Sequence, residues 1–103
     1  MEVELLFWEG CPSHPVALAE LRAALGEGVE VRVREVVSEE QAVAERFPGS
    51  PTIRVDGVDL FPSDQPPSLT CRIYRLRDGR FSPTPDPVLL REALAARFDP
   101  GQG

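Results

Sequence analysis

The chain lacks a long apolar segment and is short of positive charge. Its longest apolar run is only a few residues, so we expect no segment that spans a membrane. The first residues are acidic where a secretory signal is basic, which predicts a cytoplasmic protein. There is no lysine, and the net charge is −6. That balance argues against nucleic acid as a partner, because nucleic-acid-binding surfaces are normally basic.

Cysteine and histidine are also scarce, which makes each of them informative. The chain has two cysteines, Cys11 and Cys71, and one histidine, His14. Static disulfides are rare in cytosolic proteins. Each cysteine is therefore interpreted as an inert core residue, a reactive thiol or a metal ligand.

The length and composition fit one small α/β domain. A chain of 103 residues corresponds to a single domain, residues 1–103, and a hydrophobic content of 42% is enough for a modest core. Residues 2–8 run apolar and predict a first strand that is buried on both faces. Leucines recur at helical spacing over residues 12–25, which predicts a helix. Valine alternates with charged residues over 29–37, which predicts an edge strand with one wet face.

The second half of the chain predicts a helix, a hairpin, an insertion and a last helix. Ser38 and Gln41 form a capping box for a helix that reaches about residue 47. Asp56-Gly57 separates two short strands within 50–61 and predicts an antiparallel hairpin. Residues 62–85 are interpreted as an insertion with an extra strand or small hairpin. Asp86 then caps a helix whose apolar stripe contains three residues, Leu90, Leu94 and Phe98.

Four arginines gather in the insertion and have two interpretations. Arg72, Arg75, Arg77 and Arg80 lie on or near the predicted extra strand. They either form a solvated strand face or contact an anion close to a cysteine, since arginine suits carboxylate and phosphate groups.

The most informative segment is Trp8-Glu9-Gly10-Cys11-Pro12-Ser13-His14. It places Cys11 between the first strand and the first helix. Unpaired backbone N–H groups and the positive end of the helix dipole stabilise a thiolate at such a junction. They are expected to lower the pKa of Cys11 below the free value of ~8.5.

These features together resemble the thioredoxin-like superfamily. The resemblance rests on Trp8-x-x-Cys11-Pro12-Ser13-His14, on Ser50-Pro51-Thr52 with its hairpin, and on the order of elements. It covers the chain except about residues 62–85. It implies an α/β thioredoxin-like fold. The expected sheet is four-stranded and mixed, with a parallel first pair and an antiparallel last hairpin, and three helices cover both of its faces.

The resemblance also implies roles for single residues. Cys11 matches the nucleophilic cysteine, and Pro12 matches the proline that follows it in glutaredoxin-like sites. Pro51 matches the superfamily's cis proline, which faces the thiol. Its neighbour Ser50 would have a backbone free to pair with an extended ligand. Trp8, Ser50 and Thr52 complete the predicted substrate-binding set, although packing is the simpler interpretation of Trp8.

The chain departs from the superfamily pattern at His14, where redox-active members usually have a second cysteine. Three readings follow. Cys71 resolves the mixed disulfide, because the loop 62–70 leaves from the edge of the sheet that holds Cys11. Alternatively an external thiol resolves it, and His14 lowers the pKa of Cys11 or relays protons. In the third reading Cys11, His14 and Cys71 bind a soft metal.

The sequence therefore predicts thiol–disulfide chemistry with Cys11 as the attacking thiol and Cys71 and His14 as further catalytic residues. No cofactor is expected. The predicted partner is a protein or a small molecule that carries a thiol or a disulfide. The alternative is a non-enzymatic thioredoxin-like module that binds a peptide or a soft metal.

Overall fold

A computed structural model describes residues 2–98, with the side chain of Phe98 left out. Its elements are, in order, β1 (Val3–Phe7), α1 (His14–Leu25), β2 (Val31–Glu35), α2 (Glu39–Glu45), β3 (Thr52–Val55), β4 (Val58–Asp59), β5 (Tyr74–Arg75), β6 (Phe81–Ser82) and α3 (Pro87–Phe98). None of the helices within these residues is long and apolar enough to cross a membrane.

The main sheet is four-stranded and mixed, as the sequence predicts. Its strand order is β2-β1-β3-β4, in which β1 pairs parallel with β2 and antiparallel with β3. β3 and β4 form the antiparallel hairpin across Asp56-Gly57. Asp56 and Gly57 have positive φ angles of 52° and 81°. Glycine adopts such angles without strain, and aspartate tolerates them better than most residues.

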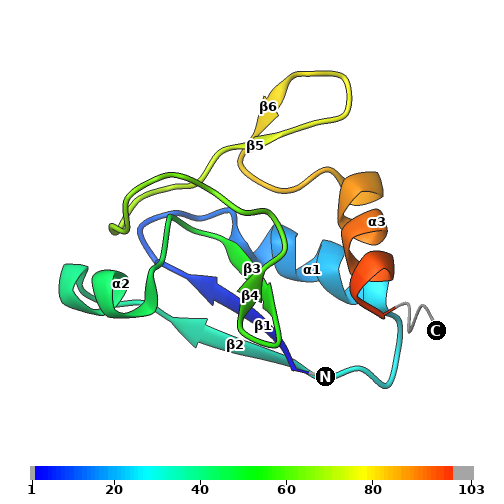
Figure 1. The fold of residues 1–103 in the computed structure, drawn as a ribbon, viewed down its shortest axis with the longest axis horizontal. Coiled ribbons are helices and arrows are strands. Elements are labelled where there is room, and N and C mark those ends of the chain that lie inside the picture. Colours follow the sequence, from blue (N-terminus) through cyan, green and yellow to red (C-terminus); the bar gives the residue numbers. More distant parts are fainter. Residues whose placement is uncertain (1, 99–103) are drawn as a thin grey trace.

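Two buried clusters show which helices cover which face of the sheet. Successive strand residues point to opposite faces. One cluster joins β1 and β3 to α1 and α3 through Val3, Leu5, Ala17, Leu21, Ile53, Val55, Leu60, Leu90 and Leu94. The other joins the opposite face to α2 through Leu6, Val36, Ala42 and Phe47. The predicted arrangement of three helices on both faces is confirmed (Figure 1).

The strand β2 lies at the edge of the sheet as predicted, but its two faces differ from the expectation. Val31 packs on the core, whereas Val33 is exposed, because an edge strand has a neighbour on one side only. On the other face Arg34 is half-buried and pairs with Glu4 of β1 at 3.3 Å and with Glu45 of α2. The predicted wet face is therefore partly an ionic contact with α2.

The predicted caps of α2 and α3 are present. Ser38 Oγ accepts a hydrogen bond from Gln41 N at 3.0 Å. The Gln41 side chain reaches Val37 N rather than the Ser38 N–H that a standard capping box uses. Asp86 Oδ1 accepts from Val88 N at 2.8 Å at the start of α3.

The insertion contains a small hairpin and no helix. β5 and β6 pair antiparallel and project beyond the main sheet (Figure 1). The predicted strand from Cys71 to Leu76 is shorter than expected. Cys71 makes an isolated parallel bridge with Ser50, and regular pairing begins only at Tyr74. The first part of the insertion therefore makes an isolated bridge to the residues just before β3, and the second part forms a separate two-stranded sheet.

Candidate functional site

Cys11 lies in a tight turn between β1 and α1. Its N–H donates to Trp8 O at 3.0 Å, and only 3% of the residue is exposed. The helix begins at His14, not at Pro12 as predicted. The reason is Pro15, which has no N–H to donate to Cys11 O, so the first helical bond runs from Ala17 N to Ser13 O.

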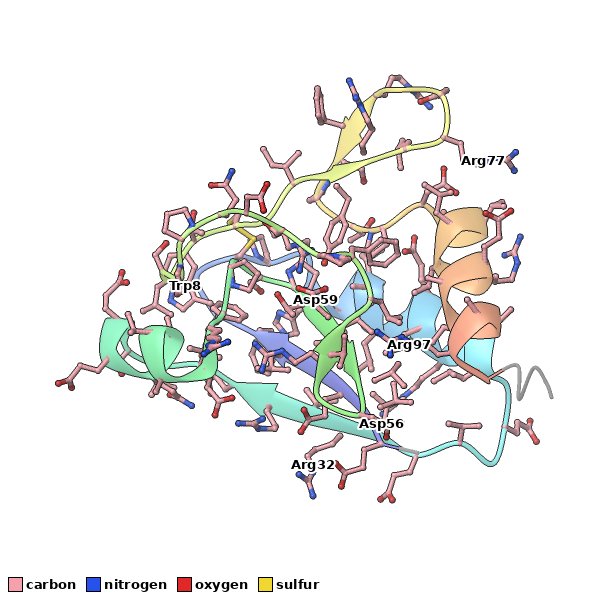
Figure 2. The ribbon with its side chains drawn as sticks, viewed as in Figure 1. Trp8, Arg32, Asp56, Asp59, Arg77 and Arg97 are labelled. Carbon is pink, nitrogen blue, oxygen red and sulfur yellow. A yellow bond between two sulfur atoms is a disulfide. The ribbon has the colours of Figure 1, made fainter. Side chains whose placement is uncertain are left out.

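Cys11 and Cys71 are joined by a disulfide. Their Cα atoms are 5.5 Å apart, and the residues are separated by 60 positions in the sequence. The loop 62–70 thus returns to the Cys11 edge of the sheet, the course that the first of the three readings requires. Figure 2 draws the bond in yellow. The interpretation of Cys71 as a buried core residue is wrong, because Cys71 is exposed.

Two oxygen atoms lie near the Cys11 sulfur. Ser13 Oγ is 3.6 Å from Cys11 Sγ, and the Ser50 carbonyl oxygen is 3.7 Å away. Ser13 is the N-cap residue of α1, but its hydroxyl makes no capping bond. The hydroxyl is therefore available to donate to a Cys11 thiolate whenever the disulfide opens.

Ser50, Pro51 and Thr52 are buried at the start of β3, and Ser50 contacts the Cys11 turn. The peptide bond between Ser50 and Pro51 is cis. Ser50 Oγ accepts a hydrogen bond from Trp8 N at 3.0 Å. Three of the predicted substrate-binding residues are thus held by the protein itself, next to the disulfide.

The prediction that the Ser50 backbone is free to pair with a ligand is wrong. Ser50 N donates to Thr70 O at 2.8 Å, and Arg72 N donates to Ser50 O at 2.8 Å. One more bond, from Ser68 N to Phe47 O, continues this pairing. The segment 68–72 of the chain's own insertion occupies the strand position that was assigned to an external peptide.

Arg72 fixes this segment from the opposite side. Its guanidinium is buried and donates to Asp59 Oδ2 at 2.8 Å, to Thr52 Oγ1 at 3.2 Å and to the Phe61 carbonyl. Arg72 is therefore not a free anion contact. The other three members of the arginine cluster, Arg75, Arg77 and Arg80, are exposed, and Arg77 extends from the turn of the projecting hairpin (Figure 2).

Tyr74 extends the same support toward the cis proline. Its hydroxyl donates to Pro51 O, and its ring lies 4.7 Å from the Arg72 guanidinium carbon. Burial raises the pKa of Tyr74 well above its ordinary value of 10, so the hydroxyl remains a donor. Asp59 and Tyr74 were missed as site residues. The sequence did contain a signal for Tyr74: in a strand over 71–74, Arg72 and Tyr74 share one face, and Cys71 and Ile73 share the other.

His14, Trp8 and Pro12 lie around the turn without contacting the sulfur through a hydrogen bond. The His14 ring stacks on Phe7, with centroids 4.0 Å apart, and within residues 2–98 its buried Nδ1 has no hydrogen-bond partner. Trp8 is half-buried and packs on the α2 cluster, as its simpler interpretation predicts. Pro12 is exposed beside Cys11.

Two cavities flank the insertion. One, of about 200 Å³, is lined by Pro48, Ser63, Gln65, Thr70, Cys71, Arg72 and Ile73. A wider one, of about 730 Å³, lies between the end of α2 and the β3–β4 hairpin and has no cysteine in its wall. The smaller cavity therefore places solvent-accessible space against Cys71.

Comparison of the chain with protein-family models, with curated proteins and with solved structures finds no match. Within residues 2–98 no three side chains from His, Cys, Asp and Glu lie together as a metal site.

Proposed function

We propose that this chain is a thioredoxin-like thiol–disulfide oxidoreductase whose redox pair is Cys11 and Cys71. The observation that carries the proposal is the disulfide between them, which joins a buried strand–helix turn to an exposed segment. In the reaction, a partner dithiol loses two electrons and two protons and becomes a disulfide, while the Cys11–Cys71 bond is reduced to two thiols.

The surroundings of the pair support a thioredoxin-like arrangement. A mixed sheet of order β2-β1-β3-β4 carries α1 and α3 on one face and α2 on the other. Cys11 follows β1, and the cis Ser50–Pro51 bond precedes β3 beside it. A cytoplasmic location is part of the same proposal; in that compartment a disulfide is usually transient and catalytic.

The alternative function, a non-enzymatic module that binds a peptide or a soft metal, has less support. Segment 68–72 already pairs with the backbone of Ser50, where a peptide would add as a strand. In the disulfide, the sulfur atoms of Cys11 and Cys71 are bonded to each other and lack the thiolate that a soft metal needs.

The test is catalysis of insulin reduction by dithiothreitol. Wild-type protein and the control variant Val33→Ser, altered at an exposed position of β2, should both accelerate the reduction. Cys11→Ser and Cys71→Ser should each lose most of the acceleration, because neither can form the intramolecular bond and each then depends on dithiothreitol to release its mixed disulfide. Circular dichroism of each variant checks that it is folded.

A wild-type rate equal to the uncatalysed rate would contradict the proposal and leave the disulfide a structural cross-link. A second measurement follows the alkylation rate of reduced protein against pH. We expect a Cys11 pKa below ~8.5, since Ser13 Oγ and the start of α1 favour the thiolate. A value at or above that figure would remove the basis for Cys11 as a reacting group.

A further inference from the structure

The two cysteines of the disulfide differ in access. Residue Cys11 is 3% exposed, with its sulfur 3.7 Å from Ser50 O, whereas residue Cys71 is exposed and forms part of the wall of the 200 Å³ cavity. Cys11 is not among the residues that line that cavity. A thiol that approaches from solvent therefore meets Cys71 first.

We propose that an incoming thiol enters this cavity and attacks Cys71, so that Cys71 carries the mixed disulfide and Cys11 leaves as the thiolate. This inference rests on the proposed function and assigns the order of its two cysteines. The partner thiolate forms a bond to Cys71 Sγ, the Cys11–Cys71 bond breaks, and its electron pair goes to Cys11 Sγ. A second thiol of the partner then displaces Cys71 as a thiolate and closes the partner's disulfide.

The protein holds a donor beside Cys11 that can stabilise it as the leaving thiolate. Ser13 Oγ lies 3.6 Å from Cys11 Sγ and has no capping bond to give up. A thiolate that is stabilised by a hydrogen-bond donor leaves faster.

This order is the reverse of the one that the sequence predicts. There, Cys11 attacks the substrate and Cys71 resolves. Because exchange is reversible, the same exposed cysteine reacts first in both directions. In the reduced protein, Cys71 attacks the partner's disulfide and Cys11 resolves the product.

The cavity also limits the partner. Its volume of about 200 Å³ is below the ~300–1,000 Å³ of pockets that enclose drug-sized ligands. It fits a single thiol-bearing side chain or a small thiol. Its wall combines polar side chains with Ile73, which is 69% exposed. We therefore expect that a charged residue introduced at position 73 changes how fast small thiols react, according to the charge of the thiol.

The experiment maps the first adduct on the wild-type protein. Oxidised protein is mixed briefly with 2-mercaptoethanesulfonate, quenched with acid and treated with N-ethylmaleimide. The protein is then digested, and the masses of the two cysteine-containing peptides are measured by mass spectrometry. We expect the mercaptoethanesulfonate on Cys71 and the maleimide on Cys11. The opposite pattern would overturn this inference and leave the proposed function intact. A folded protein that reacts at neither sulfur would contradict both.

Single-cysteine variants give a second readout that does not depend on trapping. Reduced Cys11→Ser, which keeps Cys71, should react with cystamine at least tenfold faster than Cys71→Ser, which keeps Cys11. In Cys71→Ser the bonds of Ser50 to segment 68–72 and the contacts of Arg72 do not involve the changed sulfur, so we expect the segment to stay in place and Cys11 to remain buried. Equal rates, or a faster Cys11, would overturn the assignment.

A charge introduced at Ile73, in the wall of the 200 Å³ cavity, tests whether the thiol enters through this cavity. In Ile73→Glu, the reaction of oxidised protein with 2-mercaptoethanesulfonate should slow relative to cysteamine, by about tenfold at low salt. Val33→Glu adds the same charge on β2, away from the cavity wall, and should leave the ratio unchanged. An unchanged ratio in Ile73→Glu would show that the thiol does not pass this side chain.

Discussion

The two halves of the disulfide site are held in different ways. The half that carries Cys11 is mainly a local turn: its N–H bonds to Trp8 O and Ser13 lies against its sulfur, while Ser50 adds a distant contact. The half that carries Cys71 is held by distant residues, through Ser50 on the backbone and through Asp59 and Thr52 on the Arg72 side chain. Half of the site is therefore a local turn, and half exists only in the folded chain.

Because the two halves are held by different contacts, different substitutions should affect them separately. A change to a long-range contact should loosen the Cys71 segment and leave the Cys11 turn in place. A change to α1 should act on the Cys11 half alone.

The largest expected effect comes from loss of the covalent link. Cys11→Ala and Cys71→Ala each remove a bond between residues 60 positions apart, which costs about 4 kcal/mol in unfolding free energy by the chain-entropy relation. Urea unfolding of each variant against oxidised wild type measures the loss. The two variants should agree with each other and with reduced wild type. A loss below about 1 kcal/mol would show that the bond does not constrain the chain.

Next in size is Arg72→Met. This change leaves the Asp59 carboxylate without its partner and removes the bonds to Thr52 and Phe61, so we expect a loss of about 3 kcal/mol. Equilibrium unfolding in urea checks it. The control is Arg75→Met, on the exposed face of the β5–β6 hairpin, which should change the free energy of unfolding by less than about 0.5 kcal/mol. Equal losses in the two variants would mean that Arg72 does not anchor the segment.

Tyr74→Phe should have a smaller effect. It leaves Pro51 O without the Tyr74 hydroxyl but keeps the ring beside Arg72, so we expect a loss of about 1 kcal/mol. Thermal unfolding measures this change. Limited proteolysis of the same variant should show earlier cleavage within 62–72 than within α1. Simultaneous cleavage of both regions would contradict the separation of the two halves.

The smallest expected effect comes from α1, the helix that follows the Cys11 turn. Burial raises the pKa of Glu20, and nearby Asp86 raises it further. With a raised folded pKa, protonated Glu20 favours the fold below pH 4.5, and this stability is lost as the pH rises through the folded value. Glu20→Gln should therefore raise the melting temperature at pH 7 by about 1–2 °C and give no gain below pH 4.5.

The matched control for Glu20 is Glu92→Gln, an exposed carboxylate on α3. It should leave the melting temperature unchanged at both pH values. A gain from Glu20→Gln that persists at low pH would show that the carboxylate charge is not its cause.

The sequence predicts what neighbours in the chain determine. The sheet, both caps and the β3–β4 hairpin follow from alternation, from Ser38 and Asp86, and from Asp56-Gly57. The start of α1 was misplaced because two prolines lie near it, and only the hydrogen bond that Pro15 cannot donate selects His14.

The rest of the site depends on contacts between distant residues. The occupation of Ser50 by segment 68–72 depends on where a proline-rich loop of the insertion returns, and alternation does not encode that. Burial of Arg72 follows from its meeting with Asp59 of β4. From the sequence alone, an arginine next to a cysteine in a polar segment is expected to be exposed to solvent. The ion pair between Arg72 and Asp59 therefore could not be predicted without the structure.

The pairing of Ser50 with segment 68–72 has a consequence for any ligand that binds by adding a strand. A segment tethered through a short loop competes at an effective concentration in the millimolar range. A free peptide with the same backbone bonds would have to exceed that concentration to displace it. The insertion thus makes the edge at Ser50 selective against weak extended ligands at ordinary cellular concentrations, whatever their sequence.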